Sequence, residues 1–532
     1  MANPAYLSSD QVLDLKTLTA RAAARSPDRI AFTFDETAER LTFYDVERRS
    51  NQFAHMLHTL GLGNGDRVGL MLRNRPEFPL AWLGIVKAGA VMVPLNVHYK
   101  SVDAGYLLEH SGVKAVICEN EFVALISHAA PSVAQSNLVI SIGGTQDRAL
   151  APLLQHASTD PLSVEVGEES LANIQYTSGT TGKPKGCMLS HGWFLRFAWR
   201  MSVVQHGLNE TDVLMTAQPF YYVDPQWNVA LSLLIGAELV VLDRFHPSSF
   251  WCKAREHHVT WFYCLGVMPK LLLKMPESSD DREHNVRYVT CSAIPPRDHQ
   301  AIEERWGVPW YDTFGMTESG LDINVTPEDH DRLVGRGAIG TAMPTREARI
   351  VGADNCPVPR GEVGELVMRG TGLMDGYYRN PEATAETFKN GWLHSGDLAH
   401  MDKDGIIYFV GRKKDMIRRS GENIAAAEVE EVITQHEAVH MAAVVPVPDD
   451  TRGEEVKAYV VLQAGYCKDD VSPQVLSEFC AERIAYFKIP RYWAYRDDLP
   501  RTPSERVIKS ELIAGEDDLR AGAYDRVDDC WR

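Results

Sequence analysis

The segment Tyr176-Thr-Ser-Gly-Thr-Thr-Gly-Lys-Pro-Lys-Gly186 has side chains suited to binding an oxyanion. Its three glycines let backbone N–H groups converge, its four hydroxyl residues donate hydrogen bonds, and its two lysines add positive charge. Only two residues separate Gly179 from Gly182, and a proline follows Lys183, so the spacing is not that of a Walker A loop. The segment lies between a strand-like approach and a helix-like stretch that begins near Ser190. We therefore predict a loop that binds a triphosphate, rather than a linker.

Further motifs supply the other groups that a nucleotide needs. Tyr311-Asp-Thr-Phe-Gly-Met-Thr-Glu318 combines an aromatic ring, which can cover a purine, with a carboxylate, which is a hard ligand for a metal ion. Cys291-Ser-Ala-Ile-Pro295 ends a strand-like run in small residues, which a flat ring can approach closely. Gly391-Trp-Leu-His-Ser-Gly-Asp397 and Tyr408-Phe-Val-Gly-Arg412 place an acid and a base where they can bind vicinal hydroxyls.

Together and in this order, these motifs resemble those of the adenylate-forming superfamily, which includes acyl-CoA synthetases, luciferases and the adenylation domains of peptide synthetases. The resemblance extends over nearly the whole chain. It implies an ATP-dependent acid–thiol ligase that activates a carboxylic acid as an acyl-adenylate and transfers it to coenzyme A, with ATP, Mg²⁺ and coenzyme A as its ligands. It assigns the phosphates to Thr177, Ser178, Gly179, Thr180, Thr181, Gly182, Lys183 and Lys185.

The resemblance also assigns residues to the adenine, the α-phosphate, the metal ion and the ribose. Phe314 would stack on adenine and Asp312 would accept from its amino group, while Thr317 would donate to the α-phosphate. The full assignment is adenine to Ser292, Ala293, Asp312, Thr313 and Phe314, the α-phosphate to Thr317, Mg²⁺ to Glu318, and the ribose to Asp397 and Arg412.

The acid is expected to bind at the aromatic segment that begins at Gln218. In the superfamily the matching segment carries a histidine where this chain has Tyr222. Tyr221, Tyr222 and Trp227 with Asp224 could form an aromatic box with one anion, which suits a cationic acid of the carnitine/crotonobetaine-CoA ligase type. The alternative is that these rings form the wall of a site for any small acid.

A mobile C-terminal part is expected to serve both reaction steps. Lys414 occupies the hinge position of the family pattern, and Gly421 would lie beside the channel for the pantetheine arm of coenzyme A. The family expects a lysine near the end of the chain that bridges the carboxylate and the phosphates. Here Arg506 stands in its place, with Lys509 as the alternative.

Two rival functions remain open on the sequence. One is an acyl-adenylate synthetase that transfers the acyl group to a carrier protein, and the other is a non-catalytic nucleotide-binding protein that lost the tail lysine. Acid-dependent pyrophosphate exchange would separate the enzymes from the non-enzyme, and thioester formation with coenzyme A would separate the two enzymes.

Composition limits the partners. The 532 residues carry 54 basic and 72 acidic side chains, a net charge of −18, which argues against a nucleic-acid surface and against docking on anionic lipid. The nine cysteines form no CxxC pair, which is typical of a reducing compartment. No signal pattern or membrane-spanning run is visible. We therefore expect a cytoplasmic protein without membrane insertion, and a homodimer remains open.

Alternating helical and strand-like patterns predict the elements that carry these motifs. The early part of the chain offers a helix opening at Leu41-Thr42, a strand over 68–72, a helix over 77–87 and a strand over 90–95. Further strand-like runs lie at 115–118, 138–142, 239–242, 261–265 and 288–291. We predict an α/β fold: a large N-terminal domain of helix-covered, mainly parallel sheets over residues 1–411, and a small mobile α+β domain over 412–532 with its hinge near Lys414. The small domain should contain helices over 425–436 and 472–487 and strands over 442–445 and 457–462.

Overall fold

The computed structural model describes residues 14–144, 148–177, 184–204, 206–420, 422–449, 451–501, 507–514, 516 and 518–532. The chain divides into two compact units. The first takes residues 1–336, 340–347 and 368–393, and the second takes 337–339, 348–367 and 394–532. The predicted domain boundary between residues 411 and 412 stays a prediction.

A six-stranded sheet in the first unit carries the predicted phosphate loop. Its strand order is β6-β5-β3-β4-β7-β8, and all neighbours are parallel except the last pair. The strands are β3 (Arg67–Met71), β4 (Val91–Pro94), β5 (Val113–Glu119), β6 (Val139–Ile142), β7 (Leu171–Thr177) and β8 (Lys185–Ser190).

A second sheet in the first unit carries the Thr-Glu motif. Its order is β14-β13-β12-β11-β9-β10-β1-β2, with antiparallel pairs at both ends and parallel pairs between them. The strands are β1 (Ile30–Phe34), β2 (Glu39–Thr42), β9 (Val213–Thr216), β10 (Glu238–Val241), β11 (Trp261–Leu265), β12 (Tyr288–Ser292), β13 (Trp310–Met316) and β14 (Gly320–Asn324), and β15 (Ala338–Ala342) pairs with β14. The short strand β18 (Phe388–Lys389) pairs instead with β19 (Trp392–Met401).

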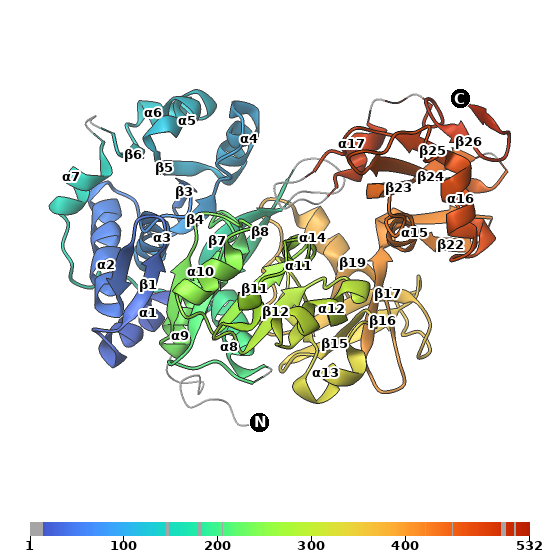
Figure 1. Cartoon of the computed structure of the whole chain (residues 1–532). Helices are drawn as coiled ribbons and strands as arrows, with labels where there is room; N and C mark the ends of the chain where they lie inside the picture. The colour runs from blue at the N-terminus through green and yellow to red at the C-terminus, as the bar shows by residue number, and fades with distance from the viewer. Residues whose placement is uncertain are drawn as a thin grey trace. The chain divides into compact units, whose positions relative to one another are not determined.

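Helices cover these sheets, as Figure 1 shows for α2 and α3, which pack on each other. The helix α2 begins with a capping box in which Thr42 Oγ1 accepts from Asp45 N at 3.0 Å and Asp45 Oδ2 accepts from Thr42 N at 3.1 Å. The helices are α1 (Leu15–Arg25), α2 (Phe43–Thr59), α3 (Glu77–Lys87), α4 (Ser101–Ser111), α5 (Val123–Ala129), α6 (Pro131–Gln135), α7 (Leu150–Gln155), α8 (His191–Val203), α9 (Val223–Ile235), α10 (Phe250–Glu256), α11 (Met268–Leu273), α12 (Pro296–Trp306), α13 (Pro327–Leu333) and α14 (Pro381–Thr387).

Apolar faces of the helices and strands form the cores of the first unit. One core lies under α10, α11 and α12, where Trp251 and Trp306 stack with ring centres 5.0 Å apart. Another lies between the six-stranded sheet and α4 and α5, and includes Val116, Leu108 and Ile126. These cores fix the strands whose ends carry the predicted site residues.

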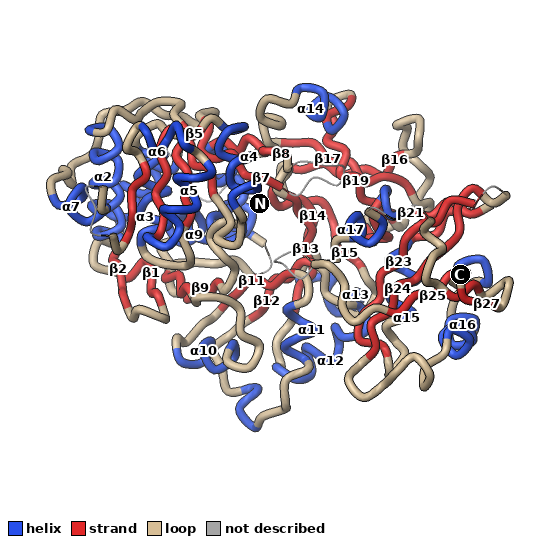
Figure 2. Tube along the Cα trace, turned by 90° about the horizontal axis from the view of Figure 1, so that it is seen from above, coloured by secondary structure: helices blue, strands red, loops and turns tan. Residues whose placement is uncertain are grey.

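The second unit is built mainly of strands. Figure 2 shows β23, β24 and β25 side by side, and α15 packs on β23. The strands are β16 (Arg346–Val351), β17 (Gly364–Gly370), β19 (Trp392–Met401), β20 (Ile407–Arg412), β21 (Met416–Arg419), β22 (Glu422–Ala425), β23 (Val439–Asp449), β24 (Gly453–Leu462), β25 (Tyr492–Tyr495), β26 (Tyr524–Asp525) and β27 (Cys530–Trp531), and the helices are α15 (Ala426–Ile433), α16 (Pro473–Ala481) and α17 (Lys509–Ile513).

The predicted fold class is confirmed. The helix α3 and the strand β11 have the predicted bounds, and α8 begins at His191 with Ser190 as its cap. The helix predicted over 472–487 ends earlier, because α16 stops at Ala481 and the chain enters a short 3₁₀ turn at Tyr486. Over the described part of the chain, every helix is too short or too polar to cross a bilayer.

Candidate active site

The predicted phosphate loop follows the strand β7 and precedes the strand β8 in the chain. The two strands are antiparallel, and Thr177 at the end of β7 pairs with Lys185 at the start of β8. A strand therefore separates the loop from the helix α8. Of the residues predicted to bind phosphate, Thr177 and Lys185 can be placed, whereas Ser178, Gly179, Thr180, Thr181, Gly182 and Lys183 lie outside the described residues.

Glu318, the predicted metal ligand, lies beside the two ends of this hairpin. The Tyr377 O–H donates to Glu318 Oε1 at 2.9 Å. Cys187 of β8 is buried, and the charge of Glu318 is close enough to help raise the pKa of its thiol, after burial as the larger cause; Thr177 Oγ1 lies 4.0 Å from the same sulfur. Lys185 Nζ lies 5.0 Å from the centre of the Tyr377 ring. The Thr-Glu motif and the ends of the phosphate hairpin thus form one cluster.

A buried ion pair holds the turn that follows Glu318. Arg346 Nε lies 2.7 Å from Asp322 Oδ1, and neither side chain has exposed surface. Arg346 also donates to Ser319 O at 2.6 Å, and the Ser319 hydroxyl donates to Asp322. Breaking a buried pair leaves an uncompensated charge at a cost of about 3–5 kcal/mol, so this turn is held firmly.

Asp312 anchors the predicted adenine turn, which follows β12. Its Oδ1 accepts from Ala293 N at 3.3 Å and its Oδ2 from Ile294 N at 3.2 Å. Burial raises the pKa of Asp312 to about 7. Ala293 is exposed and has a φ of +69°, in the left-handed region that strains an L-residue. The turn offers a small, exposed surface, and a direct contact between Asp312 and adenine stays a prediction.

The remaining residues of the Thr-Glu motif lie along the end of β13. The Thr313 hydroxyl donates to Ile323 O at 2.7 Å, which ties β13 to β14. Phe314 and Thr317 are both partly exposed. Thr313 therefore has a partner within the fold, whereas the side chains of Phe314 and Thr317 remain available to a ligand.

Asp224, in the first turn of α9, lies among aromatic rings. Trp227 Nε1 donates to Asp224 Oδ1 at 3.4 Å, and the rings of Tyr221 and Tyr222 lie 4.8 Å apart. Burial raises the pKa of Asp224 to about 6, although the residue keeps part of its surface exposed. Trp227 has no exposed surface and stacks on Phe197 with ring centres 4.5 Å apart. Trp227 is therefore a wall behind Asp224 rather than an open face.

Tyr263 links the acid segment to the adenine turn. Its hydroxyl lies 2.7 Å from Ser292 Oγ, and its ring meets Trp227 edge-on with centres 5.2 Å apart. The charge of Asp224 is close enough to help raise the pKa of Tyr263, after burial as the larger cause. Two segments predicted to bind different parts of the substrates therefore share one buried tyrosine.

Buried amides fix the backbone of the acid segment. Gln175 of β7 donates to Tyr221 O at 2.9 Å, and Gln226 donates to Phe220 O at 2.9 Å. Asn74 Oδ1 accepts from Phe220 N at 2.8 Å. Since Gln175 lies two residues before Thr177, the strand that enters the phosphate loop also positions the acid segment.

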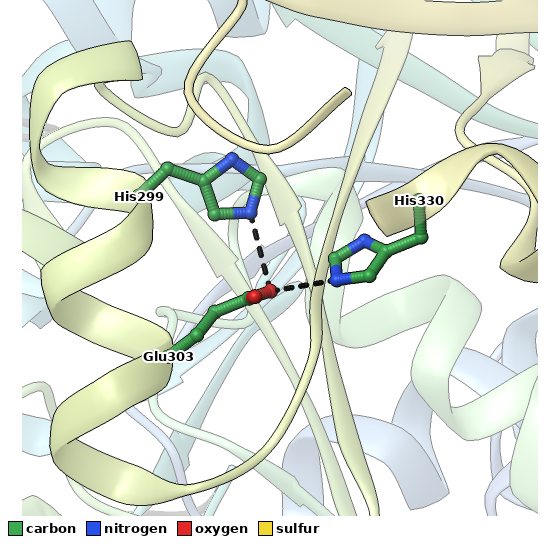
Figure 3. A group of neighbouring side chains, drawn as sticks. All are labelled: His299, Glu303 and His330. Atoms are coloured by element: carbon green, nitrogen blue, oxygen red, sulfur yellow. Dashed lines mark ion pairs between the residues drawn. The ribbon is translucent and has the colours of Figure 1, made fainter. Parts of the chain in front are cut away.

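Two histidines and a glutamate hold the start of β13 (Figure 3). Glu303 Oε1 lies 3.0 Å from His330 Nε2 and 3.3 Å from His299 Nε2, and it accepts from Trp310 N at 2.6 Å. Burial opposes ionisation, yet these donors lower the pKa of Glu303 to about 2. His299 Nδ1 accepts from Gly335 N at 3.4 Å, so Nε2 carries the proton that it donates to Trp310 O at 2.8 Å. That nitrogen has no lone pair for a metal, and the group is better described as a clamp on Trp310, two residues before Asp312.

In the second unit, the two predicted ribose ligands contact each other. Asp397 and Arg412 are paired across β19 and β20, with Arg412 Nε 2.6 Å from Asp397 Oδ1. Nearby, Glu365 forms ion pairs with Lys413 at 2.8 Å and with His394 at 3.1 Å. The charged groups around the expected hinge therefore pair with one another within the second unit.

The hinge and tail residues are only partly placed. Lys414 is exposed in a short 3₁₀ turn. Gly421 and Arg506 lie outside the described residues. Lys509, the alternative tail cation, lies with its Nζ 2.6 Å from Glu430 Oε1, so it has a partner within its own unit.

Sequence reasoning missed Tyr377, Cys187, Tyr263 and Glu365. Each contacts a predicted site residue or borders the expected hinge, but each is separated from its partners by tens of residues in the chain. A lone buried cysteine or tyrosine carries no signal in local spacing. Only the pairing of distant strands reveals these contacts.

Comparison with known proteins adds independent findings. The model of the family described as AMP-binding enzyme matches residues 19–378, and that of the AMP-binding enzyme C-terminal domain matches 428–506. The crotonobetaine/carnitine–CoA ligase of Salmonella paratyphi B is 32% identical over 505 residues, which cover 91% of this chain and 96% of that protein. ATP-bound MatB from Rhodopseudomonas palustris is similar in structure, with a TM-score of 0.84 and 27% identity over 94% of this chain and 98% of that chain. The o-succinylbenzoate CoA synthetase of Bacillus subtilis, in complex with its acyl-adenylate intermediate, has a TM-score of 0.82 and 26% identity over 94% and 98% of the two chains.

Proposed function

The chain belongs to the AMP-binding enzyme family and ligates a carboxylic acid to coenzyme A through an acyl-adenylate, and we propose that the acid it takes carries a positive charge. The observation that carries this proposal is Asp224, a partly exposed carboxylate whose pKa burial raises to about 6. A cation beside it would favour its charged form and offset the cost of burial.

The surroundings of Asp224 fit a quaternary ammonium group. Tyr221 and Tyr222 provide aromatic rings, and such rings attract cations that cannot donate hydrogen bonds. The Salmonella relative is named for crotonobetaine and carnitine, two acids that carry a trimethylammonium group. This relation supports the same class of acid for the present chain.

The first step needs alignment and charge rather than a covalent intermediate on the enzyme. A carboxylate oxygen of the acid attacks the α-phosphorus of ATP, forming an O–P bond as the bond to pyrophosphate breaks. Lys185, Thr177 and the loop between them bind the phosphates, and Thr317 donates to the α-phosphate. In the second step the deprotonated sulfur of coenzyme A attacks the acyl carbon, and AMP leaves.

Glu318 fits a divalent metal ion, because it offers a hard oxygen and is hydrogen-bonded to Tyr377, whose ring lies under Lys185 of the phosphate hairpin. We assign it the Mg²⁺ that accompanies ATP. When bound there, Mg²⁺ would neutralise negative charge on the phosphates. The Tyr377 hydroxyl donates to this carboxylate and holds it in place.

We assign to the second unit the binding of the ribose and the domain movement between adenylation and thioester formation. Asp397 and Arg412, already paired, would bind the two ribose hydroxyls. The exposed Lys414 would act as the hinge of a mobile domain over residues 412–532, and Gly421 would lie beside the arriving pantetheine arm. The cytoplasm, where coenzyme A and ATP are both available, is the proposed setting.

Arg506 is the proposed tail cation for adenylation. Its rival Lys509 lies 2.6 Å from Glu430 and 3.7 Å from Asp415. Using Lys509 would break an ion pair with a carboxylate whose burial already raises its pKa. A guanidinium can instead bind a carboxylate and a phosphate through separate N–H groups.

Coenzyme-A-dependent release of AMP tests the proposal. The assay compares a trimethylammonium acid with its neutral isostere, in which a tert-butyl group replaces the ammonium group, and includes short and aromatic acids. We expect kcat/KM to be about 100-fold higher for the cationic acid, since one charge pair at a partly buried site contributes roughly 3 kcal/mol. Equal efficiency for the two would refute the cationic substrate and leave the ligase activity standing.

A further inference from the structure

We propose that Tyr377 positions the carboxylate of Glu318 for the metal that accompanies ATP, and that residues 374–378, here called the strap, hold Tyr377 for this task. The inference rests on the proposed role of Glu318 in binding Mg²⁺. Neither the sequence motifs nor the family resemblance assigns a function to the strap.

The backbone of the strap bridges the two motifs. Tyr378 N donates to Gly186 O at 2.8 Å, so the strap pairs with β8, the strand that leaves the phosphate loop. At its other end, Met374 N donates to Glu318 O at 2.8 Å. A segment of five residues is thus bonded to both the phosphate hairpin and the Thr-Glu turn.

The side chain of Tyr377 also contacts both the Thr-Glu turn and the phosphate hairpin. Its hydroxyl donates to Glu318 Oε1 at 2.9 Å, and its ring lies under Lys185 Nζ, 5.0 Å from the ring centre. The residue is 8% exposed, and burial together with the charge of Glu318 raises the pKa of Tyr377 far above its ordinary value.

This arrangement controls where the charge of Glu318 points. A carboxylate with one oxygen fixed by a hydroxyl cannot rotate freely, so its other lone pairs keep a defined direction toward a metal. Without the hydroxyl, Glu318 could turn toward the ammonium of Lys185. That pairing would withdraw both the metal ligand and a phosphate-binding cation at once.

Tyr377→Phe removes the hydroxyl and keeps the ring, and Tyr378→Phe is the matched control on the next residue of the strap. Tyr378 is partly buried, with its ring 6.0 Å from that of His110, away from the contact with Glu318. Calorimetry on the full chain without acid measures the Kd of ATP with saturating Mg²⁺ and in EDTA. The Kd in EDTA divided by the Kd with Mg²⁺ reports how strongly the binding of metal and the binding of nucleotide are coupled.

We expect Tyr377→Phe to lower this ratio about tenfold, the usual effect of losing a partner that orients a metal ligand, with the Kd in EDTA unchanged. Tyr378→Phe should leave both values unchanged. An unchanged ratio in Tyr377→Phe would overturn the inference. That outcome includes an equal loss of affinity with and without metal, which a purely structural role predicts.

Glu318→Gln separates this inference from the function beneath it. If Glu318→Gln lowers the ratio and Tyr377→Phe does not, only the role of Tyr377 is wrong. If Glu318→Gln keeps the wild-type ratio, Glu318 does not bind the metal, and the inference falls with that proposed role.

Discussion

Asp224→Asn removes the charge of the acid-site carboxylate and keeps its size. We expect it to stabilise the fold and, at the same time, to abolish the preference for a cationic acid. The first effect follows because burial raises the pKa of Asp224 from 3.8 to about 6, so its charged form is disfavoured in the folded protein. The second follows because a neutral amide could not attract an ammonium group by charge.

The size of the stability effect follows from the two pKa values. At 1.36 kcal/mol per pH unit, the difference between 3.8 and about 6 corresponds to at most about 3 kcal/mol. The folded-state pKa lies above the unfolded one, so the wild type loses this free energy as pH rises from about 4 to about 6. The advantage of Asp224→Asn should therefore be full at pH 8 and about half as large at pH 5.

Two measurements on the same pair of proteins test this reasoning. Thermal unfolding at pH 8 and pH 5 should show a higher midpoint for Asp224→Asn, with the larger gap at pH 8. For the wild type, kcat/KM with a trimethylammonium acid should fall about tenfold per pH unit below 6, where Asp224 becomes protonated. Asp224→Asn should give a flat ratio of cationic to neutral acid across the same range.

The outcomes that contradict this reasoning are specific. A variant that is less stable at pH 8 would mean that the Asp224 charge is favourably paired in the free protein. A variant that keeps a 100-fold preference for the cationic acid would mean that another group recognises the ammonium. The neutral isostere controls for titration of the substrate's own carboxyl group.

Three further tests address other parts of the molecule. Ala293→Gly should raise the free energy of unfolding by about 0.5–1 kcal/mol, because glycine adopts the φ of +69° without strain; a lower unfolding midpoint would contradict this. Arg506→Ala should slow acid-dependent pyrophosphate exchange at least about 100-fold, whereas Lys509→Ala should slow it less than about threefold; the reverse pattern would identify Lys509 as the tail cation. A thiol reagent should modify four cysteines rapidly in the native protein and the other five only after unfolding, and rapid modification of Cys187 would refute its burial. The four are the exposed Cys252, Cys356, Cys467 and Cys530.

Some helices and strands could be predicted from the sequence because a single local signal was enough to identify them. The helix α2 could be predicted because Thr42 caps it and its apolar residues recur at helical spacing. The strand β11 could be predicted because its five residues form an uninterrupted apolar run, as buried parallel strands do. Each signal comes from residues within a single helix or strand, so it does not depend on how distant parts of the chain fold.

The candidate site was predictable only in part. The nucleotide motifs could be identified from their residue types, because hydroxyls, glycines and carboxylates suit phosphate and metal. The bond from Tyr377 to Glu318 could not, since it joins residues 59 apart through strap and sheet pairings that no local pattern encodes. The end of α16 was missed for a related reason: helical spacing continues past Ala481, but the chain turns there to pack on the second unit's core, which includes Cys480 and Ile489.

The buried amides behind the acid segment have a consequence for how the acid specificity of such an enzyme can change. Gln175, Gln226 and Asn74 bind the segment through main-chain atoms of Phe220 and Tyr221. These three amides therefore contact no side chain of Phe220 or Tyr221. Phe220 is nevertheless fixed by packing, since it has no exposed surface and stacks on Phe78 with ring centres 5.0 Å apart. A substitution at Tyr221 would keep the three hydrogen bonds, so the strand leading to the triphosphate would keep its place.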